Sequence, residues 1–185
     1  MTTVALFGGS FNPVHVAHQL VALYVLETQP VDELWLVPTW AHPFGKPLAP
    51  FGDRVAMCAL AAAALGPRVQ VSRAEEELAR KPGFVASRTL DLIEHLGGDL
   101  RLVIGSDILA ETAKWYRWDE VCRRAPPIVV ARPGFPGGGE VAITDVSATR
   151  VRELLAAGDP AAAQYVPAGV LRYIAEHGLY DAPHA

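Results

Sequence analysis

The sequence predicts an α/β fold, a doubly wound parallel sheet in a single domain that spans residues 1–185. Two features indicate this fold. Short unbroken apolar runs, typical of parallel strands buried on both faces, alternate with longer segments of helical periodicity. No two of these runs are joined by a hairpin signal, so we expect right-handed helical crossovers and helices on both faces of the sheet.

Composition agrees with one domain that has a real core and limits the classes of function. The chain has 185 residues, of which 51% are hydrophobic, and a net charge of −4, which argues against broad nucleic-acid binding. Its two cysteines, Cys58 and Cys122, lack the spacing of metal ligands. We expect Cys58 to be buried in the protein, and we expect the protein to work in a reducing cytoplasm. The first residues do not resemble a signal peptide, and no apolar run is long enough to predict a membrane span.

The elements follow one another along the chain as short strands and longer helices. Strands are predicted at residues 4–7, 33–37, 69–72, 100–104 and 127–131. Helices are predicted from about residue 16, at 51–65, at 89–96, after Ser147 and at 166–177, with Leu20 and Leu23 on the apolar stripe of the first. We expect the acidic run Glu75–Glu77 to be a solvated face and the segment 132–140 to be a flexible surface loop.

The first strand leads into the most informative stretch of the chain. Gly8 and Gly9 predict a sharp turn that a ligand can approach closely, and a helix begins at about Val16. Such a helix start offers free amides and a positive dipole end to an anion. His15 and His18 are three residues apart and share one face of this first turn. Together these features predict a phosphate site, although surface histidines or a metal pair would show the same spacing.

Three later segments follow strands or begin helices, where parallel α/β proteins bind ligands. Lys46 lies in a loop rich in proline and glycine after the second strand, as a phosphate ligand or as a solvated lysine. Asp107 follows the fourth strand, as a ribose ligand or as the N-cap of a short helix. Ser147 is a good N-cap, and the helix it opens presents Arg152 one turn further on, as a phosphate ligand or as a surface charge.

These segments resemble the nucleotidyltransferase superfamily with the HxGH signature. Its GG-T/S-F-D/N-P-x-H-x-G-H pattern appears here as GGSFNPVHVAH, with Ala17 in place of a glycine. Its G-x-D…W-x-x-W pattern is matched by Gly105, Asp107, Trp115 and Trp118, of which we expect Trp118 in the core and Trp115 near the ligand. Its I-S-S-T-x-I-R pattern appears as VSATRVR, and its lysine loop appears in altered order as HPFGK. Within the superfamily the chain is most similar to the nicotinate-nucleotide adenylyltransferase family.

The resemblance implies a Rossmann-like fold, an activity and a set of site residues. The implied reaction joins ATP and nicotinate mononucleotide to give deamido-NAD and pyrophosphate. Catalytic cationic clamps would be His15, His18, Lys46 and Arg152. ATP contacts would come from Gly8, Gly9, Ser10, Phe11, Gly105, Asp107, Ser147 and Thr149. Mononucleotide contacts would come from Val85, Ala86, Thr89, Trp115 and Tyr116.

Several alternatives stay open at this stage. Mg²⁺ is expected to arrive on the ATP phosphates, since no carboxylate cluster suits a protein-bound ion. The acceptor could instead be nicotinamide mononucleotide or phosphopantetheine, or the transferred group cytidylyl. Ala17, the altered lysine loop and Val85–Ala86 would also fit a nucleotide-binding homologue that has lost catalysis. Neither a nucleic-acid nor a membrane partner is expected, and a homo-oligomer remains open.

Overall fold

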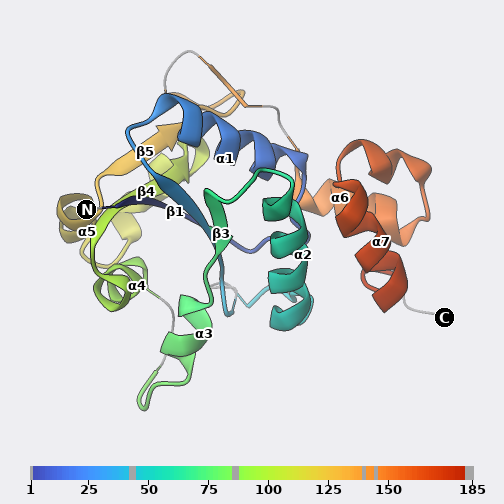
Figure 1. Ribbon diagram of the computed structural model, residues 1–185, viewed down its shortest axis with the longest axis horizontal. Helices are drawn as coiled ribbons and strands as arrows, with labels where there is room; N and C mark the ends of the chain where they lie inside the picture. Colours follow the sequence, from blue (N-terminus) through green and yellow to red (C-terminus); the bar gives the residue numbers. More distant parts are fainter. Residues whose placement is uncertain (1, 42–44, 85–87, 139–140, 144–145, 182–185) are drawn as a thin grey trace.

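The computed structural model describes residues 2–41, 45–84, 88–138, 141–143 and 146–181. Over these residues one parallel sheet has the strand order β3-β2-β1-β4-β5 (Figure 1). The strands are β1 (Thr3–Gly9), β2 (Glu33–Pro38), β3 (Val69–Val71), β4 (Asp99–Gly105) and β5 (Pro127–Val130). Each predicted strand is confirmed to within about two residues, because a continuous apolar run is what a doubly covered parallel strand requires.

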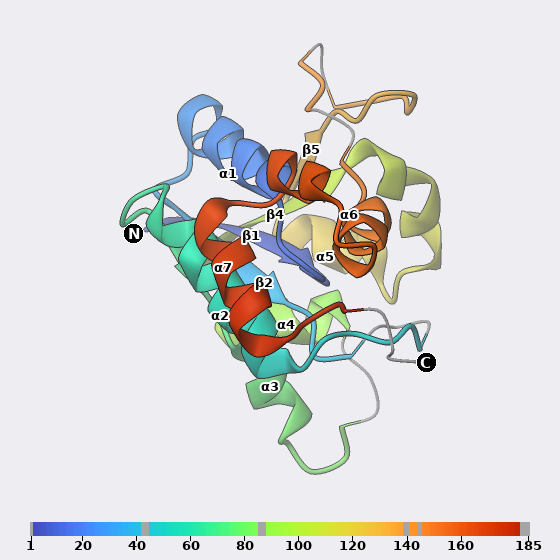
Figure 2. The same cartoon turned by 90° about the vertical axis from the view of Figure 1, so that its right-hand side faces the viewer.

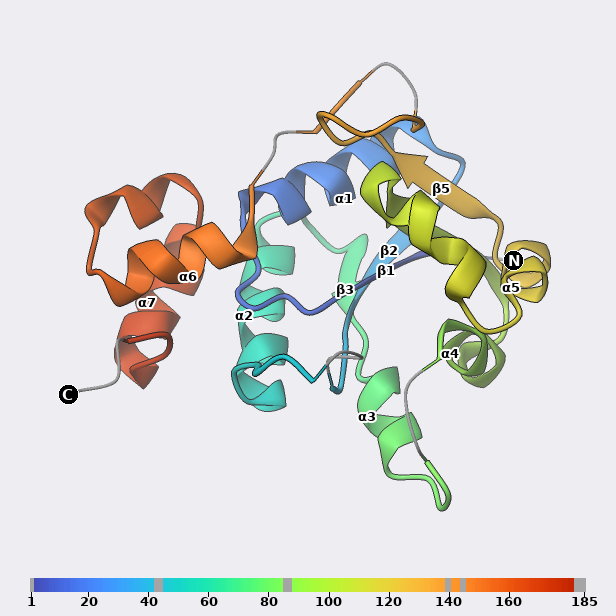
Figure 3. The ribbon, with the colours of Figure 1, turned by 180° about the vertical axis from the view of Figure 1, so that it is seen from behind.

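Helices cover both faces of the sheet, as predicted. On one face lie α1 (Val16–Thr28) and α2 (Phe51–Ala63), and on the other lie α3 (Ala74–Ala79), α4 (Thr89–Leu96) and α5 (Trp118–Arg124) (Figures 1 and 3). Alternate strand residues divide between the two layers: Ala5 packs with the α1 side, whereas Val4 and Leu6 pack with the α4 side. The period of two along a strand produces this division.

The remaining helical elements are α6 (Ala148–Ala156), α7 (Ala168–His177) and the 3₁₀ segments η1 (Ser106–Lys114) and η2 (Pro160–Gln164). Figure 2 shows α7 lying alongside α2, and α7 adds Val170 and Ile174 to the core cluster of the α1 face. Helix α7 therefore extends the layer of helices on the α1 face of the sheet. Within the described residues, no helix is long and apolar enough to cross a membrane.

The acidic run before α4 is a place where the sequence-based prediction was wrong. Residues Glu75 and Glu76 are buried in α3, a helix that was not predicted. Glu76 pairs with Arg73 and Arg80 at 2.7 Å each, and a Glu75 carboxylate oxygen accepts from the backbone N–H of Trp40 at 3.4 Å. Burial of these carboxylates follows from partners outside the run, which the acidic pattern itself does not reveal.

The predicted apolar stripe of the first helix also needs correction. Leu20 and Leu23 are exposed by 44% and 48%, and α1 instead meets the sheet through Ala17, Ala22 and Val25. The small side chains of Ala17 and Ala22 face the sheet, whereas Leu20 and Leu23 point away from it.

Candidate active site

The carboxyl ends of β1 and β4 mark the centre of the predicted site. These strands are hydrogen-bonded neighbours, and the chain leaves β1 toward β2 and β3 on one side and reaches β4 and β5 on the other. Strand order therefore reverses at this point, where open parallel sheets bind their ligands. The predicted site residues after β1 and β4 therefore lie at the point where the strand order reverses.

The turn after β1 lies later than predicted. Gly8 and Gly9 remain in the strand and pair with Val37 and Pro38, so the glycines do not form the turn. The chain turns at residues 10–13, where Phe11 has a φ of 44° and the Asn12–Pro13 peptide bond is cis. A Cβ on Gly9 would lie 3.2 Å from Cζ of the Phe11 ring, so this glycine makes room for the ring.

His15 and His18 are stacked on each other at the start of α1. Their ring centroids are 3.7 Å apart with an interplanar angle of 24°, and the edge of the Phe11 ring packs on His18 at 4.9 Å. The backbone N–H of His15 donates to Nδ1 of His18 at 3.1 Å. Because Nδ1 accepts this bond, the neutral imidazole of His18 carries its proton on Nε2 and can donate there.

Both histidines are neutral near pH 7, which corrects the prediction that they are cationic clamps. Burial, helped by the charge of Arg132, lowers the pKa of His15 to about 4. Burial, then His15 and then Arg132 hold the pKa of His18 well below its usual value. The pair can therefore stabilise charge on phosphate oxygens as neutral N–H donors.

Fewer amides are free at this helix start than the sequence predicted. The backbone N–H of Val16 donates to the carbonyl of Tyr165 at 2.8 Å, and that of His18 donates to the carbonyl of His15 at 2.9 Å. A phosphate here would therefore meet side-chain donors more than backbone amides. At the same helix start, the Nδ1 atom of His15 is buried and has no hydrogen-bond partner among the residues that the structure describes.

Arg152 of α6 reaches the turn after β1. Its Nη1 donates to the carbonyl of Asn12 at 2.8 Å, and its Nη2 to the hydroxyl of Thr149 at 3.2 Å. The structure thus joins two predicted motifs that are 140 residues apart. Ser147 occupies the N-cap position of α6, as predicted, but its hydroxyl makes no capping bond there. A hollow of about 230 Å³ lies at this helix start, lined by Val146, Ser147, Arg150, Val151 and Tyr165.

Asp107 follows β4 at the same edge of the sheet. It is not the predicted N-cap, since that position at the start of η1 belongs to Gly105. One carboxylate oxygen, Oδ2, pairs with Arg132 at 3.0 Å, whereas Oδ1 is buried without a hydrogen bond in the described part of the chain. A Cβ on Gly105 would lie 2.2 Å from this Oδ1, so the glycine leaves room for the carboxylate. The role of Asp107 as a ribose ligand stays a prediction.

Two arginines at this edge had been given no role from the sequence. Arg132 lies two residues beyond β5, pairs with Asp107, and donates its backbone N–H to the hydroxyl of Ser106 at 3.0 Å. It had been assigned to a flexible surface loop, yet the segment folds back on the strand, with Gly138 packed against the backbone of Ala131. Its position immediately after a strand was the available signal.

Arg54 is the other arginine; with Met57 it resembles an R-x-x-M pattern of the family, and it is 1% exposed. Its guanidinium donates to the carbonyls of Ser10 and Ala49 at 2.9 Å each and of Trp40 at 3.4 Å. It therefore ties the turn after β1 to both ends of the loop between β2 and α2. Burial lowers the pKa of this guanidinium, which remains charged at neutral pH.

The lysine loop is described only in part. Lys46 is exposed and makes no hydrogen bond or ion pair with the described residues. His42 lies outside the described residues. The loop is held next to the site by its later part, where the backbone N–H of Ala49 donates to Oδ1 of Asn12 at 3.0 Å. Lys46 thus lies three residues before Ala49, the residue whose backbone N–H contacts the turn.

The predicted acceptor residues come from two segments that the structure brings together. The Arg88 guanidinium, at the N-cap of α4, lies 4.4 Å from the ring centroid of Tyr116, so the residues before Thr89 and those after η1 are neighbours. Trp115 and Trp118 pack edge to face at 5.4 Å, and both rings lie against the core. Trp118 thus packs on the core as expected, and the role of Trp115 at the ligand stays a prediction. Val85 and Ala86 lie outside the described residues.

Comparison with known proteins places this site in a family. The cytidylyltransferase-like family profile matches residues 6–154. A probable nicotinate-nucleotide adenylyltransferase of Anaeromyxobacter dehalogenans is 51% identical over 183 residues, covering 96% of each chain. One of the same name from Myxococcus xanthus is 41% identical and covers 96% of this chain and 94% of its own.

Solved structures share the fold. A Plasmodium falciparum nicotinic acid mononucleotide adenylyltransferase, complexed with NaAD, superposes with a TM-score of 0.78 over 97% of this chain and 98% of its own, at 17% identity. This likeness confirms the α/β architecture, and the more similar sequences confirm the resemblance drawn from the motifs. The chain belongs to the cytidylyltransferase-like family and, within it, to the nicotinate-nucleotide adenylyltransferases.

Proposed function

We propose that this protein transfers the adenylyl group of ATP to nicotinate mononucleotide, giving deamido-NAD and pyrophosphate in NAD synthesis. One observation carries the proposal within the structure: the bond from Nη1 of Arg152 to the carbonyl of Asn12 joins two phosphate-binding motifs at one sheet edge. Relatives that share half of the sequence bear the name of this activity.

The chemistry needs no covalent intermediate on the protein. A phosphate oxygen of the mononucleotide attacks the α-phosphorus of ATP, and the bond from that phosphorus to the bridging oxygen breaks as pyrophosphate leaves in line. Since the attacking phosphate is already ionised, no general base is required. Catalysis then consists of positioning and of stabilising charge on the phosphate oxygens.

The residues divide this work by charge. His18 donates from Nε2 as a neutral imidazole, so it meets the phosphate oxygens without first losing or gaining a proton. Arg152 supplies a fixed cationic fork, and Lys46 supplies a mobile cation from the loop after β2. Asp107 offers Oδ1 to a hydroxyl of the nucleotide.

The magnesium ion is best regarded as part of the MgATP substrate. Among the described residues there is no group of three or more histidine, cysteine, aspartate or glutamate side chains arranged to hold a metal. Asp107, a carboxylate of the predicted site, already pairs with Arg132. Such a donor set suits an ion that remains on the phosphates, where Mg²⁺ keeps several of its waters.

The acceptor preference follows from hydrogen-bond chemistry. A site lined by N–H donors, as the family resemblance implies near residues 85–86 and 115–116, satisfies a carboxylate but meets the NH₂ of a carboxamide with donor against donor. An unpaired buried donor costs about 1–3 kcal/mol, or about 5- to 150-fold in kcat/KM. The Arg88 guanidinium stacked on Tyr116 adds positive charge near the same place.

The test measures pyrophosphate release from MgATP with three acceptors: nicotinate mononucleotide, nicotinamide mononucleotide and phosphopantetheine. We expect the first to give the highest kcat/KM by at least about 5-fold. A ratio near one between the two mononucleotides would instead identify a dual-specific enzyme. Pyrophosphate release with phosphopantetheine alone, or with no acceptor at all, would contradict the proposal.

Two further features of the proposed enzyme concern its surroundings. Cys58 and Cys122 are both free thiols, which supports action in a reducing compartment such as the cytoplasm. ATP and a pyridine mononucleotide are its proposed partners, and the net charge of −4 favours small ligands over nucleic acid. Leu20 and Leu23, exposed side by side on α1, would be available to a second copy of the chain.

A further inference from the structure

The side chain of Asn12 connects three segments around the phosphate turn. It is 4% exposed, and its Oδ1 accepts two hydrogen bonds, from the backbone N–H of Ala49 at 3.0 Å and from the hydroxyl of Tyr180 at 2.9 Å. The orientation of the amide is fixed, because a backbone N–H can only donate. The carbonyl of the same residue receives Nη1 of Arg152.

Tyr180 reaches this turn from a distance of 168 residues along the chain. It follows α7, which ends at Gly178 in a left-handed conformation, and Tyr180 itself has a φ of 64°. Because its partner Oδ1 is only an acceptor, the phenol must donate. Burial raises the pKa of Tyr180 well above its usual value, so the donor proton is present throughout the neutral range.

We propose that Tyr180 is a positioning residue for the ATP phosphates, acting through Asn12 on Arg152 and on the loop that carries Lys46. This inference rests on the proposed function and extends it to Tyr180, which within the described residues makes no hydrogen bond to His15, His18, Lys46 or Arg152. The hydroxyl of Tyr180 and the N–H of Ala49 fill both acceptor positions of Oδ1, so Asn12 has one orientation. That orientation fixes the carbonyl to which the Arg152 fork is bound.

The geometry also explains why a small change would be felt at a distance. Arg152 makes a bond to a backbone atom of Asn12, so a rotation of that peptide moves the guanidinium as well. Ala49 is three residues beyond Lys46, so a looser Asn12 side chain also weakens one of the bonds that hold the lysine loop. Another of these is the bond from Arg54 to the carbonyl of Ala49. Both cations would then spend less time where the phosphates need them, and a displacement of about 1 Å can lower a rate strongly.

The chain offers a matched control for removing this hydroxyl. Tyr173, on α7, donates its phenolic hydrogen to Oδ1 of Asp53 at 2.8 Å, which joins α7 to α2 without contacting the phosphate turn. Tyr173→Phe and Tyr180→Phe each delete one oxygen and one hydrogen bond from the same end of the chain. Their effects on folding should be similar, whereas their effects on ATP should differ.

The experiment measures kcat and KM for both substrates, the binding of MgATP by calorimetry, and the melting temperature of each variant. Tyr180→Phe should lower kcat/KM for ATP by about 2- to 13-fold, the range for one neutral hydrogen bond, and leave KM for nicotinate mononucleotide unchanged. Tyr173→Phe should leave all kinetic parameters within about twofold, since its bond lies outside the site.

A second comparison separates positioning from a loss of stability. In an Arg152→Ala background, Tyr180→Phe should have a smaller effect on kcat/KM for ATP than in the parent, because the two residues act through one another. The proposal would be overturned if Tyr180→Phe lowered kcat/KM for ATP by the same factor in the parent and in the Arg152→Ala background. It would also be overturned if Tyr173→Phe and Tyr180→Phe lost equal activity, or if Tyr180→Phe kept the parental kcat and KM for ATP.

Calorimetry keeps this inference distinct from the proposed function. If the parent binds MgATP but makes no deamido-NAD, the proposed function fails, and the ratio of Kd values for MgATP between parent and Tyr180→Phe still decides the role of Tyr180. If the parent makes deamido-NAD and Tyr180→Phe binds and turns over ATP like the parent, only this inference fails. A parent that binds no MgATP overturns both.

Discussion

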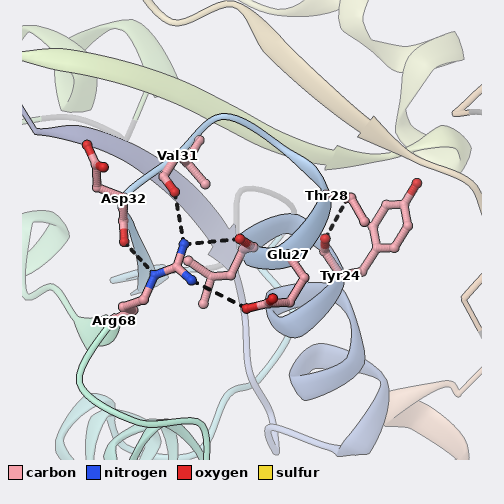
Figure 4. Close-up of polar contacts among 7 residues, drawn as sticks. Tyr24, Glu27, Thr28, Val31, Asp32 and Arg68 are labelled. Carbon is pink, nitrogen blue, oxygen red and sulfur yellow. Dashed lines mark hydrogen bonds and ion pairs between the residues drawn. The ribbon is translucent and has the colours of Figure 1, made fainter.

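The two edges of the sheet use arginine in the same way but leave different groups unsatisfied. At the amino edge, Arg68 donates to the carbonyls of Leu26, Val31 and Asp32 at 2.9–3.0 Å and pairs with Glu27 at 3.3 Å (Figure 4). The ion pair is largely exposed, with 46% and 64% of the two side chains accessible. Arg68 connects the end of α1 to the segment before β2, and each nitrogen of its guanidinium has a hydrogen-bond partner.

At the carboxyl edge, the buried Arg54 likewise binds three loop carbonyls. Around it, however, Nδ1 of His15 and Oδ1 of Asp107 are buried without hydrogen bonds in the described part of the chain. Buried polar atoms of this kind are costly unless a ligand satisfies them. We infer from this difference that the carboxyl edge accommodates a ligand, and we expect its two histidines to act as neutral donors beside Arg152.

The largest difference between the edges should appear in turnover. His18→Ala removes a donor to the phosphate oxygens and should lower kcat by about 10²- to 10³-fold. Arg68→Met at the amino edge should leave kcat within about twofold, because Arg68 contacts no residue of the site. Steady-state pyrophosphate release measures both. A His18→Ala enzyme within threefold of the parent would remove His18 from the mechanism.

Arg152 sharpens the comparison within one helix. Arg152→Lys should lower kcat/KM for ATP by about tenfold, since an ammonium cannot bind Asn12 and a phosphate with a planar fork. The matched control is Arg150→Lys, because Arg150 is exposed and pairs with Glu153 on the same helix at 3.5 Å. If both variants keep parental activity at saturating and at limiting ATP, then Arg152 is a surface charge.

The two arginines that bind carbonyls should differ in their contribution to stability. Arg54→Met leaves three carbonyls near a 1% exposed site without donors and should lower the free energy of unfolding by about 3 kcal/mol. Arg68→Met should cost about 1 kcal/mol, because water can reach its partly exposed surroundings. Urea unfolding of both variants would check this. Equal losses would mean that burial at the carboxyl edge carries no special cost.

The last difference concerns stability in acid. The folded pKa of His15 is about 4, below the 6.5 of an ordinary histidine, so the unfolded chain binds more protons between these values. Stability attributable to His15 is therefore complete above pH 6.5 and falls as the pH decreases toward 4. His15→Asn should show a shallower loss of unfolding free energy between pH 6.5 and 4.5. An unchanged pH slope would show that His15 is charged in the folded protein.

Much of the fold could be predicted from sequence because local patterns determine it. A run such as Leu100–Ile104 has no polar side to expose apart from Arg101, so it predicts a strand covered on both faces. The burial of Glu75 and Glu76 was missed because it depends on partners outside the acidic run, among them the N–H of Trp40. The helix α3 itself consists of good helix formers, so the local sequence did contain a signal for it.

The motifs indicated where the candidate site lies, but not that burial would lower the pKa values of its two histidines. The motifs located His15, His18 and Arg152 at one edge, and the bond from Arg152 to Asn12 shows why they belong together. The neutrality of the histidines arises from burial and from Arg132, which approaches from another strand. The contact between Tyr180 and Asn12 spans 168 residues, so no spacing within a motif could reveal it. The roles of Lys46, Val85 and Ala86 stay predictions.

The most direct test of the neutral-donor account is a ¹⁵N NMR titration of the histidine rings in the ligand-free enzyme. The resonances would be assigned with His15→Asn and His18→Asn variants. We predict that both rings stay neutral from pH 8 to about pH 5 and that His18 is the tautomer protonated at Nε2. A midpoint near 6.5 for either ring, or a proton on Nδ1 of His18, would contradict the account.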